Sequence, residues 1–205
     1  MDAERARVIA DFDVSRETLT RLDRVVATLD AWRGRFNLIG PREWPRLWGR
    51  HIADSLQLAP LVTGCRRIVD LGSGAGFPGL ILACALGDEA EVTLIEATQK
   101  KCAFLRAAGD AAGLRIDVRQ SRIEAVSGFP ADVITARALA PLPKLLELSA
   151  PWTQQGAFCV FPKGSSVDED VRTAQRAWDF QLSVRKSRTS STGRILKLWE
   201  VRRRG

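Results

Sequence analysis

The residues of this 205-residue chain that are best suited to bind a ligand form a glycine-rich turn and a distant acid. An apolar run, Ile68 to Leu71, leads into Gly72-Ser73-Gly74-Ala75-Gly76-Phe77-Pro78-Gly79, and a second apolar run follows it. Glycines at alternate positions let a ligand approach the backbone closely. Glu96 ends the next β-like run, where a carboxylate can accept hydrogen bonds from both hydroxyls of a ribose. The pattern therefore predicts a nucleoside site at the carboxyl ends of two neighbouring strands.

The glycine turn departs from a dinucleotide fingerprint, because the third glycine of that pattern would stand at position 77, which is Phe77. An NAD-dependent oxidoreductase is therefore disfavoured. Asp70, the three glycines and Glu96 together resemble instead the S-adenosylmethionine site of class I methyltransferases, in which the cofactor lies across the carboxyl edge of the sheet. A turn that only packs a strand on a helix would explain the glycines, but not the distal acid.

After Gly64, short β-rich runs alternate with helical runs, which predicts crossover units and a mostly parallel sheet. The expected strands are residues 67–71, 91–96, 114–120, 131–136, 156–162, 181–186 and 194–201, and the expected helices include residues 80–86 and 100–112. The last two strands are joined without a helical pattern, so we expect an antiparallel pair at the sheet edge. The predicted fold is α/β, the Rossmann-like fold of class I methyltransferases.

Two amphipathic helical runs come before this sheet, at residues 14–32 and 43–61. In the first, apolar residues recur at three- and four-residue steps, which places them on one helical face. Neither run could bury its apolar stripe alone. We therefore expect residues 1–63 to form a helical extension that packs on a methyltransferase core of residues 64–205.

The composition favours a polyanionic partner, because 31 Lys and Arg outnumber 24 Asp and Glu and give a net charge of +7. The longest apolar stretch, residues 80–86, is far shorter than the roughly 20 residues of a membrane span. The amino terminus carries charges of both signs, unlike a secretory signal. Four isolated cysteines and one histidine suggest neither a metal site nor a disulfide framework, and they fit a cytoplasmic protein.

Six short motifs occur in the order and at the spacings of one family. They are Arg35-Phe36-Asn37-Leu38, Arg50-His51-Ile52-Ala53-Asp54-Ser55, the glycine turn with Phe77-Pro78-Gly79, Gln120-Ser121-Arg122-Ile123-Glu124, Thr135-Ala136-Arg137-Ala138 and Pro162-Lys163-Gly164. On these motifs the chain from Trp32 to Trp199 resembles the 16S ribosomal RNA guanine-N7 methyltransferases, the small-subunit methyltransferase G or glucose-inhibited division protein B family. The glycine turn and the Arg-His motif are the most distinctive parts of the resemblance.

The resemblance implies S-adenosylmethionine as methyl donor, S-adenosylhomocysteine as product, no metal, and 16S ribosomal RNA or the small ribosomal subunit as partner of a cytoplasmic monomer. The expected cofactor-binding residues are Gly72, Gly74, Gly76, Phe77, Glu96, Ile123, Glu124 and Arg137. Backbone N–H groups near Ile123 could read adenine while apolar side chains cover its ring. Glu124 could also be a solvated acid at the start of a helix.

Three residues are expected to act in catalysis: Arg137, Arg122 and His51. Arg122, Lys163 and Arg194 are expected to contact RNA, because they flank strands near the carboxyl edge, and an arginine can pair with guanine O6 or with phosphate oxygens. For Lys163 and Arg194, a solvated or salt-bridged cation is an equal alternative.

His51, Asp54 and Ser55 have the spacing that places side chains on one side of a helix. A hydrolytic triad is disfavoured, because Ser55 lacks the strand-to-helix elbow on which a nucleophilic serine normally sits. Two roles stay open for His51 and Asp54. They either contact cofactor or RNA, or they form a hydrogen-bonded pair that fastens the N-terminal helices to the core.

The implied reaction is attack of the guanine N7 lone pair on the methyl carbon of a sulfonium. N7 carries no proton to remove, so we expect no general base, and the protein's task is to align the reacting atoms. The alternatives are a methyltransferase of the same fold acting on a protein or small molecule, and a non-enzymatic RNA-binding protein. The basic composition and motifs disfavour the first, and the intact turn and acids disfavour the second.

Overall fold

One sheet of seven strands forms the centre of the computed structural model, which describes residues 2–204. The strands are β1 (Arg67–Leu71), β2 (Glu91–Glu96), β3 (Ile116–Gln120), β4 (Val133–Thr135), β5 (Phe158–Lys163), β6 (Trp178–Lys186) and β7 (Arg194–Arg203). Their order is β3-β2-β1-β4-β5-β7-β6. Strand β7 pairs antiparallel with both β5 and β6, and the pairs among β1 to β5 are parallel. The predicted α/β class and the antiparallel edge pair are confirmed, although β6 begins three residues earlier than expected.

The strand register brings the predicted site residues to one edge of the sheet. Leu71 at the end of β1 pairs with Ile95, and Glu96 at the end of β2 pairs with Gln120. Since β1, β2 and β3 are parallel, the segments that follow them leave the sheet at the same carboxyl edge. The glycine turn, Glu96 and the Arg122 segment therefore lie together.

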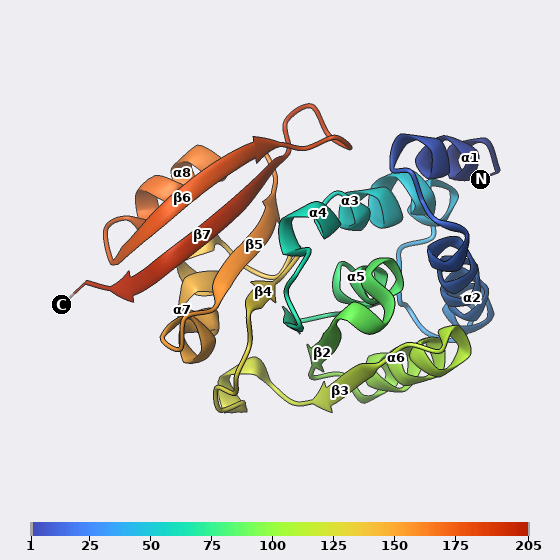
Figure 1. Ribbon diagram of the computed structural model, residues 1–205, viewed down its shortest axis with the longest axis horizontal. Coiled ribbons are helices and arrows are strands. Elements are labelled where there is room, and N and C mark those ends of the chain that lie inside the picture. Colours follow the sequence, from blue (N-terminus) through green and yellow to red (C-terminus); the bar gives the residue numbers. More distant parts are fainter. Residues whose placement is uncertain (1, 205) are drawn as a thin grey trace.

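Helices cover both faces of the sheet and enclose two apolar cores (Figure 1). On one face, α5 (Gly79–Leu86) and α6 (Gln99–Ala112) bury side chains such as Leu80 and Phe104. On the other, α7 (Leu142–Thr153) buries Leu146 and Trp152, and α8 (Val167–Ala174) buries Val167. Short 3-10 turns, η3 (Gly87–Glu89) and η4 (Ile123–Ala125), complete the connections within the core.

The N-terminal helices pack on the α5–α6 face and share its core. Helix α1 (Asp2–Asp11) comes before α2 (Arg16–Arg33), whose first turn is capped by the Ser15 hydroxyl, which accepts a hydrogen bond from Thr18 N at 3.1 Å. Leu22 and Leu29 are buried in the same apolar cluster as Leu80. None of the helices within residues 2–204 combines the length and the apolar character that crossing a membrane requires.

The single helix expected over residues 43–61 is wrong. The structure instead has a 3-10 turn η1 (Trp44–Arg46), a π-helical turn η2 (Trp48–Ile52), and two short helices α3 (Ala53–Leu56) and α4 (Ala59–Val62). Pro45 and Pro60 lie in the first turns of η1 and α4. Proline is tolerated there, because the N–H groups of a first turn have no partner within the helix, but it disrupts the interior of a longer helix. The π turn reorients the residues that carry the Arg-His motif.

Candidate active site

The glycine turn is held in a conformation that suits glycine at every predicted position. Gly72, Gly74 and Gly76 have φ angles of +66°, +58° and +88°. A Cβ on Gly72 would lie 2.7 Å from Leu139 Cδ1, and one on Gly76 would lie 2.7 Å from Leu80 Cβ. The turn is fastened to β2 because the backbone N–H of Ser73 donates to the Ile95 carbonyl at 3.1 Å. Side chains larger than hydrogen would therefore disturb the turn and its surroundings.

Glu96 faces the turn from the end of the neighbouring strand. Its Oε2 accepts a hydrogen bond from Gly74 N at 3.0 Å, and its Oε1 accepts one from Thr98 N at 2.8 Å. The residue is only 7% exposed. Each carboxylate oxygen can still accept a second hydrogen bond, so the fixed carboxylate can receive two ligand hydroxyls.

The turn and Glu96 line a cleft of about 620 Å³, here termed the first cleft. Its walls include six of the eight predicted cofactor residues: Gly72, Gly74, Glu96, Ile123, Glu124 and Arg137. The other two lie behind the wall. Gly76 packs against Leu80, and Phe77 is buried with its ring 4.9 Å from that of His51. Phe77 therefore supports the site from below.

A second cleft, of about 350 Å³, adjoins the first and shares Arg137, Ala138 and Ala140 with it. Three other predicted site residues, His51, Lys163 and Arg194, line the second cleft. Arg122 lines the first cleft, so the structure separates it from Lys163 and Arg194. The sequence motifs placed all these cations near one edge, but they did not show that the edge is divided in two.

Arg137 stands where the two clefts meet. Its Nη2 donates to His51 Nδ1 at 2.7 Å, and its Nη1 lies 3.3 Å from Asp54 Oδ2 and 3.2 Å from the Arg50 carbonyl. The guanidinium also lies over the Phe77 ring, 5.2 Å from its centroid. Burial lowers the pKa of Arg137, and the Asp54 carboxylate partly restores it. The N-terminal extension thus fixes the one arginine that both clefts share.

His51 is held as a neutral imidazole. Burial and the neighbouring Arg137 charge lower its pKa to about 4. Because a guanidinium can only donate, His51 Nδ1 is the acceptor, and Nε2 carries the proton that it donates to Glu43 Oε2 at 3.1 Å. The Ser55 hydroxyl donates to the His51 carbonyl at 2.7 Å and is buried, which is incompatible with a nucleophilic triad.

Lys163 is bound to protein partners inside the second cleft. Its Nζ lies 2.6 Å from Asp170 Oδ2 and donates to the Ala140 carbonyl at 3.0 Å, and the side chain is 12% exposed. It therefore anchors the loop after β4, in which Ala138 has a φ of +52°. Arg194 Nη1 donates to the Gly193 carbonyl at 2.8 Å.

Sequence reasoning missed several polar residues of the two clefts. Lys101 of α6 and Lys144 of α7 line the first cleft, and Glu43 and Arg50 line the second. The two lysines lie on helices outside the motifs, so no spacing marked them. Arg50 belongs to the Arg-His motif, so the motif could have identified it as a residue of the second cleft.

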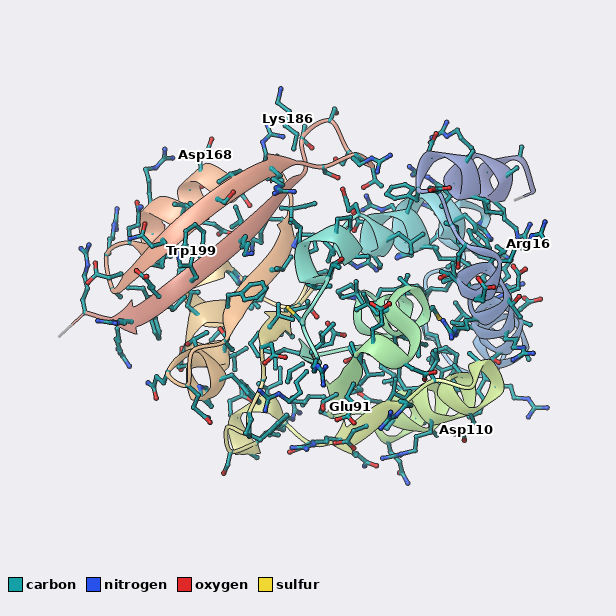
Figure 2. The ribbon with its side chains drawn as sticks, in the orientation of Figure 1. Arg16, Glu91, Asp110, Asp168, Lys186 and Trp199 are labelled. Atoms are coloured by element: carbon teal, nitrogen blue, oxygen red, sulfur yellow. The ribbon has the colours of Figure 1, made fainter. Side chains whose placement is uncertain are left out.

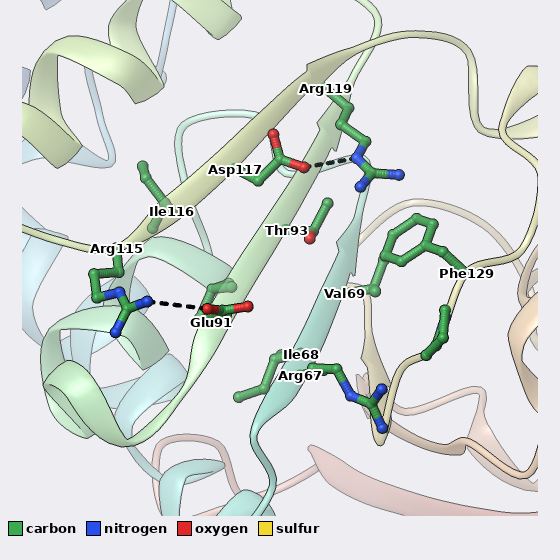
Figure 3. Close-up of a pocket in the computed structure, with 12 residues that line it drawn as sticks. Arg67, Ile68, Val69, Glu91, Thr93, Arg115, Ile116, Asp117, Arg119 and Phe129 are labelled. Carbon is green, nitrogen blue, oxygen red and sulfur yellow. Dashed lines mark hydrogen bonds and ion pairs between the residues drawn. The ribbon is translucent and has the colours of Figure 1, made fainter.

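A third cleft, of about 440 Å³, is lined by residues of β1, β2 and β3 and by Phe129 (Figure 3). Its arginines are ion-paired: Arg115 with Glu91 at 3.1 Å, Arg119 with Asp117 at 2.7 Å, and Arg67 with Asp132 at 3.0 Å. Arg119 also lies over Phe129, 3.8 Å from the ring centroid. The glycine turn and Glu96 are part of the first cleft, and this makes the first cleft the candidate cofactor site.

Asp70 lies beneath the glycine turn and is fully buried. Its Oδ1 accepts a hydrogen bond from the Thr135 hydroxyl at 2.8 Å, whereas Oδ2 has no hydrogen-bond partner among the described residues. Burial raises the pKa of Asp70 to about 6, although the Thr135 hydroxyl opposes this shift. An ionised Asp70 therefore destabilises the folded state.

We expect Asp70→Asn to raise the free energy of unfolding at pH 7.5 by about 1 to 3 kcal/mol. The folded pKa lies above the unfolded value of 3.8, so the folded state binds the proton more tightly. The wild type loses this contribution as pH rises from about 4 to above 6. Denaturant unfolding at pH 4 and 7.5 checks the prediction. An equal difference between variant and wild type at both pH values would contradict it.

Removing the Glu96 carboxylate is expected to weaken binding of S-adenosylhomocysteine by about 30-fold or more. Glu96→Ala removes the predicted acceptor of ribose hydroxyls and releases the N–H groups of Gly74 and Thr98. Isothermal calorimetry measures the change in Kd. Glu91→Ala is the matched control, because Glu91 is an exposed acid at the opposite end of the same strand β2, and we expect a change of less than about 3-fold. Equal losses in both variants would refute the role of Glu96.

Comparison with known proteins gives one consistent result. Residues 18–198 match the family model described as rRNA small subunit methyltransferase G. A protein of that name from Hyphomonas neptunium is 52% identical over 203 residues, which cover 98% of this chain and 97% of the relative. Its counterpart from Gluconobacter oxydans is 49% identical and covers 93% of this chain and 97% of its own length.

Solved structures agree on the fold. An O-methyltransferase from Bacillus cereus in complex with SAH has a TM-score of 0.60 at 16% identity, over 95% of this chain and 96% of that one. A fibrillarin from Aeropyrum pernix with bound S-adenosylmethionine has a TM-score of 0.53 at 13% identity, over 72% and 73%. The chain therefore has the fold of S-adenosylmethionine-dependent methyltransferases, as predicted.

Proposed function

Because this chain belongs to the rRNA small subunit methyltransferase G family, we propose that it methylates N7 of a guanine in an unpaired loop of 16S ribosomal RNA, in the decoding-site region, with S-adenosylmethionine as donor. The observation that carries the proposal is the pair of adjoining clefts. One cleft combines the glycine turn with Glu96. The other is lined by basic and hydroxyl side chains and by two acids, Glu43 and Asp54, that are paired with arginines, and Arg137 belongs to both clefts.

The first cleft fits the cofactor by the chemistry of its walls. Glu96 would accept hydrogen bonds from the ribose hydroxyls, and the open backbone at Gly72 and Gly74 would lie beside the methionine end. The segment with Ile123 and Glu124 would contact adenine. When bound, S-adenosylmethionine supplies a methyl group activated by its positively charged sulfur.

The residues of the site are suited to hold the reactants in place and need not move a proton. Guanine N7 has a free lone pair and no proton, so the reaction needs neither a general base nor a metal. His51 uses both ring nitrogens in hydrogen bonds to Arg137 and Glu43, which fits a positioning role. Correct alignment of reactants can lower a barrier by about 7 to 11 kcal/mol in favourable cases.

The second cleft is the proposed entry for RNA. Arg50 and Arg194 would contact phosphates, and Ser187 and Ser190 offer hydroxyl groups beside them. Lys163 would act indirectly, through the Ala140 loop that it anchors. A guanine in an unpaired loop can be turned out of its stack and enter such a cleft. The proposed enzyme acts in the cytoplasm as a monomer.

Transfer of labelled methyl groups from S-adenosylmethionine tests the proposal. The purified protein is incubated with small ribosomal subunits, naked 16S RNA and a protein and metabolite extract, all from cells lacking this protein. We expect label as 7-methylguanosine in 16S RNA, and far less in RNA from wild-type cells, whose site is already methylated. Label confined to the protein or small-molecule fraction would overturn the proposed substrate.

A further inference from the structure

Asp54 is the point at which three parts of the structure meet. Its Oδ2 lies 3.3 Å from Arg137 Nη1, in an ion pair whose side chains are 20% and 17% exposed. Its Oδ1 accepts hydrogen bonds from the Thr189 hydroxyl at 2.8 Å and from Gln57 Nε2 at 2.8 Å. One carboxylate on the short helix α3 therefore joins the arginine shared by the clefts to a loop 135 residues further along the chain.

That loop, residues 187–193, connects β6 to β7 and forms part of the wall of the second cleft. Figure 1 shows it leaving the sheet and reaching toward the N-terminal helices. Gln57, which is buried, accepts hydrogen bonds from Arg188 N at 2.9 Å and from the Ser187 hydroxyl at 3.3 Å. Lys186, just before the loop, is exposed and points outward (Figure 2). The loop is thus anchored through its first residues, while its tip is not held by Asp54 or Gln57.

The carboxylate that faces His51 is already bonded elsewhere. Glu43 accepts from His51 Nε2 at 3.1 Å and pairs with Arg50 at 3.4 Å. Of the contacts that Arg137 makes, those to Arg50 and His51 go to a carbonyl oxygen and a neutral ring nitrogen. Asp54 is the charged member of this set, and charge-assisted hydrogen bonds are the stronger ones. Its loss would leave a largely buried guanidinium without its hydrogen-bonded counter-charge, with Asp70 as a further acid that acts on Arg137.

We propose that Asp54 is a positioning residue that aligns Arg137 between the two clefts and, with its other oxygen, anchors the 187–193 loop against which RNA is seated. The proposal rests on the proposed function and deepens it, because it assigns to the N-terminal extension a part in coupling substrate seating to catalysis. RNA that binds against the loop would therefore act on the Asp54 carboxylate, the same group that orients Arg137. Asp54 itself need not touch the cofactor, since it lines only the second cleft.

Two variants separate the halves of this role. Asp54→Asn keeps an oxygen that can accept from Thr189 but removes the charge that pairs with Arg137, so we expect kcat to fall about 30-fold or more. Thr189→Val removes the hydrogen bonds of the loop hydroxyl to Asp54 and Gln57 but leaves the Asp54 charge beside Arg137, so we expect the KM for small subunits to rise about 5-fold while kcat stays within about 2-fold. Both variants should bind S-adenosylhomocysteine with a Kd within about 3-fold of wild type.

Hydrogen exchange of backbone amides provides a readout that is independent of activity. In Thr189→Val, the amides of residues 187–193 should exchange faster, while those of α5 keep the wild-type rate. Asp23→Asn is the matched control. This substitution breaks the 2.6 Å ion pair between Asp23 on α2 and Arg5 on α1, within the N-terminal extension. We expect this control to leave kcat, KM and loop exchange unchanged.

The outcomes distinguish this inference from the proposed function. If the wild type methylates 16S RNA but Asp54→Asn keeps the wild-type kcat, or Thr189→Val changes neither KM nor loop exchange, Asp54 is not a positioning residue. If Asp23→Asn lowers kcat as much as Asp54→Asn does, general loosening of the N-terminal extension explains the loss of activity. Should Asp54→Asn fail to fold, the Thr189→Val measurements decide alone. A wild type that methylates no RNA refutes the proposed function itself.

Discussion

Replacing Gly72 with aspartate is expected to raise the Kd for S-adenosylhomocysteine by about 100-fold or more and to abolish methyl transfer. The new Cβ would lie 2.7 Å from Leu139 Cδ1, and Leu139 lines the same cleft. The added carboxylate would also lie in the same cleft as Glu96, and two like charges at one site disfavour each other. Calorimetry with S-adenosylhomocysteine measures the loss directly.

Gly113→Asp is the matched control for the backbone. Gly113 ends α6 with a φ of +64°, close to the +66° of Gly72, but no atom lies within 4 Å of the position of its Cβ. The same substitution there imposes the same backbone strain and fills open space. We expect a lower Tm and a Kd within about 2-fold of wild type. A Gly72→Asp variant that binds and transfers normally would defeat the assignment of the cleft.

Exchanging Arg137 for lysine is expected to lower kcat about 100-fold while the Kd for S-adenosylhomocysteine changes by less than about 5-fold. A single ammonium cannot reach His51 Nδ1, Asp54 Oδ2 and the Arg50 carbonyl in the geometry that the planar guanidinium satisfies. The positive charge is kept, so a large loss isolates the effect of orientation. Single-turnover transfer to small subunits gives the rate of the chemical step.

Arg67→Lys serves as the control for this exchange. Arg67 is ion-paired with Asp132 and begins β1, at the opposite end of that strand from the glycine turn. We expect its kcat to stay within about 2-fold of wild type. A kcat for Arg137→Lys that matches the control would show that charge alone, and not the fork of hydrogen bonds, matters at this position.

The sequence was sufficient to predict the glycine turn and Glu96 as neighbours. Strand periodicity identified β1 and β2, and parallel pairing then brings their carboxyl ends together. The direct hydrogen bond from Gly74 N to Glu96 is a consequence of that register. By contrast, the division of the cations between two clefts depends on where the loop after β4 runs, and no local pattern encodes that path.

The N-terminal extension was predicted less well, because local periodicity cannot weigh competing backbone preferences. Apolar spacing favoured one helix over residues 43–61. Pro45 and Pro60 instead lie in the first turns of η1 and α4, and the π turn between them contains His51. Phe77 shows a similar limit. Its place after the glycines predicts cofactor contact, which stays a prediction, but no pattern indicated that its ring packs against His51 and Arg137.

Helices α7 and α8 were also absent from the predicted elements. Pro151 interrupts the pattern of α7, and α8 has only 8 residues, so periodicity along the chain did not identify either helix. Both are stabilised by packing on the second face of the sheet, where Leu146 and Val167 are buried. Such tertiary stabilisation is invisible to a pattern read along the chain.

The most direct test of the account is the 7-methylguanosine content of 16S ribosomal RNA in cells that lack this protein. Nucleoside mass spectrometry should show the loss of one 7-methylguanosine, its return with the wild-type chain, and no return with Gly72→Asp. The same 7-methylguanosine content in the presence and absence of the protein would contradict the account.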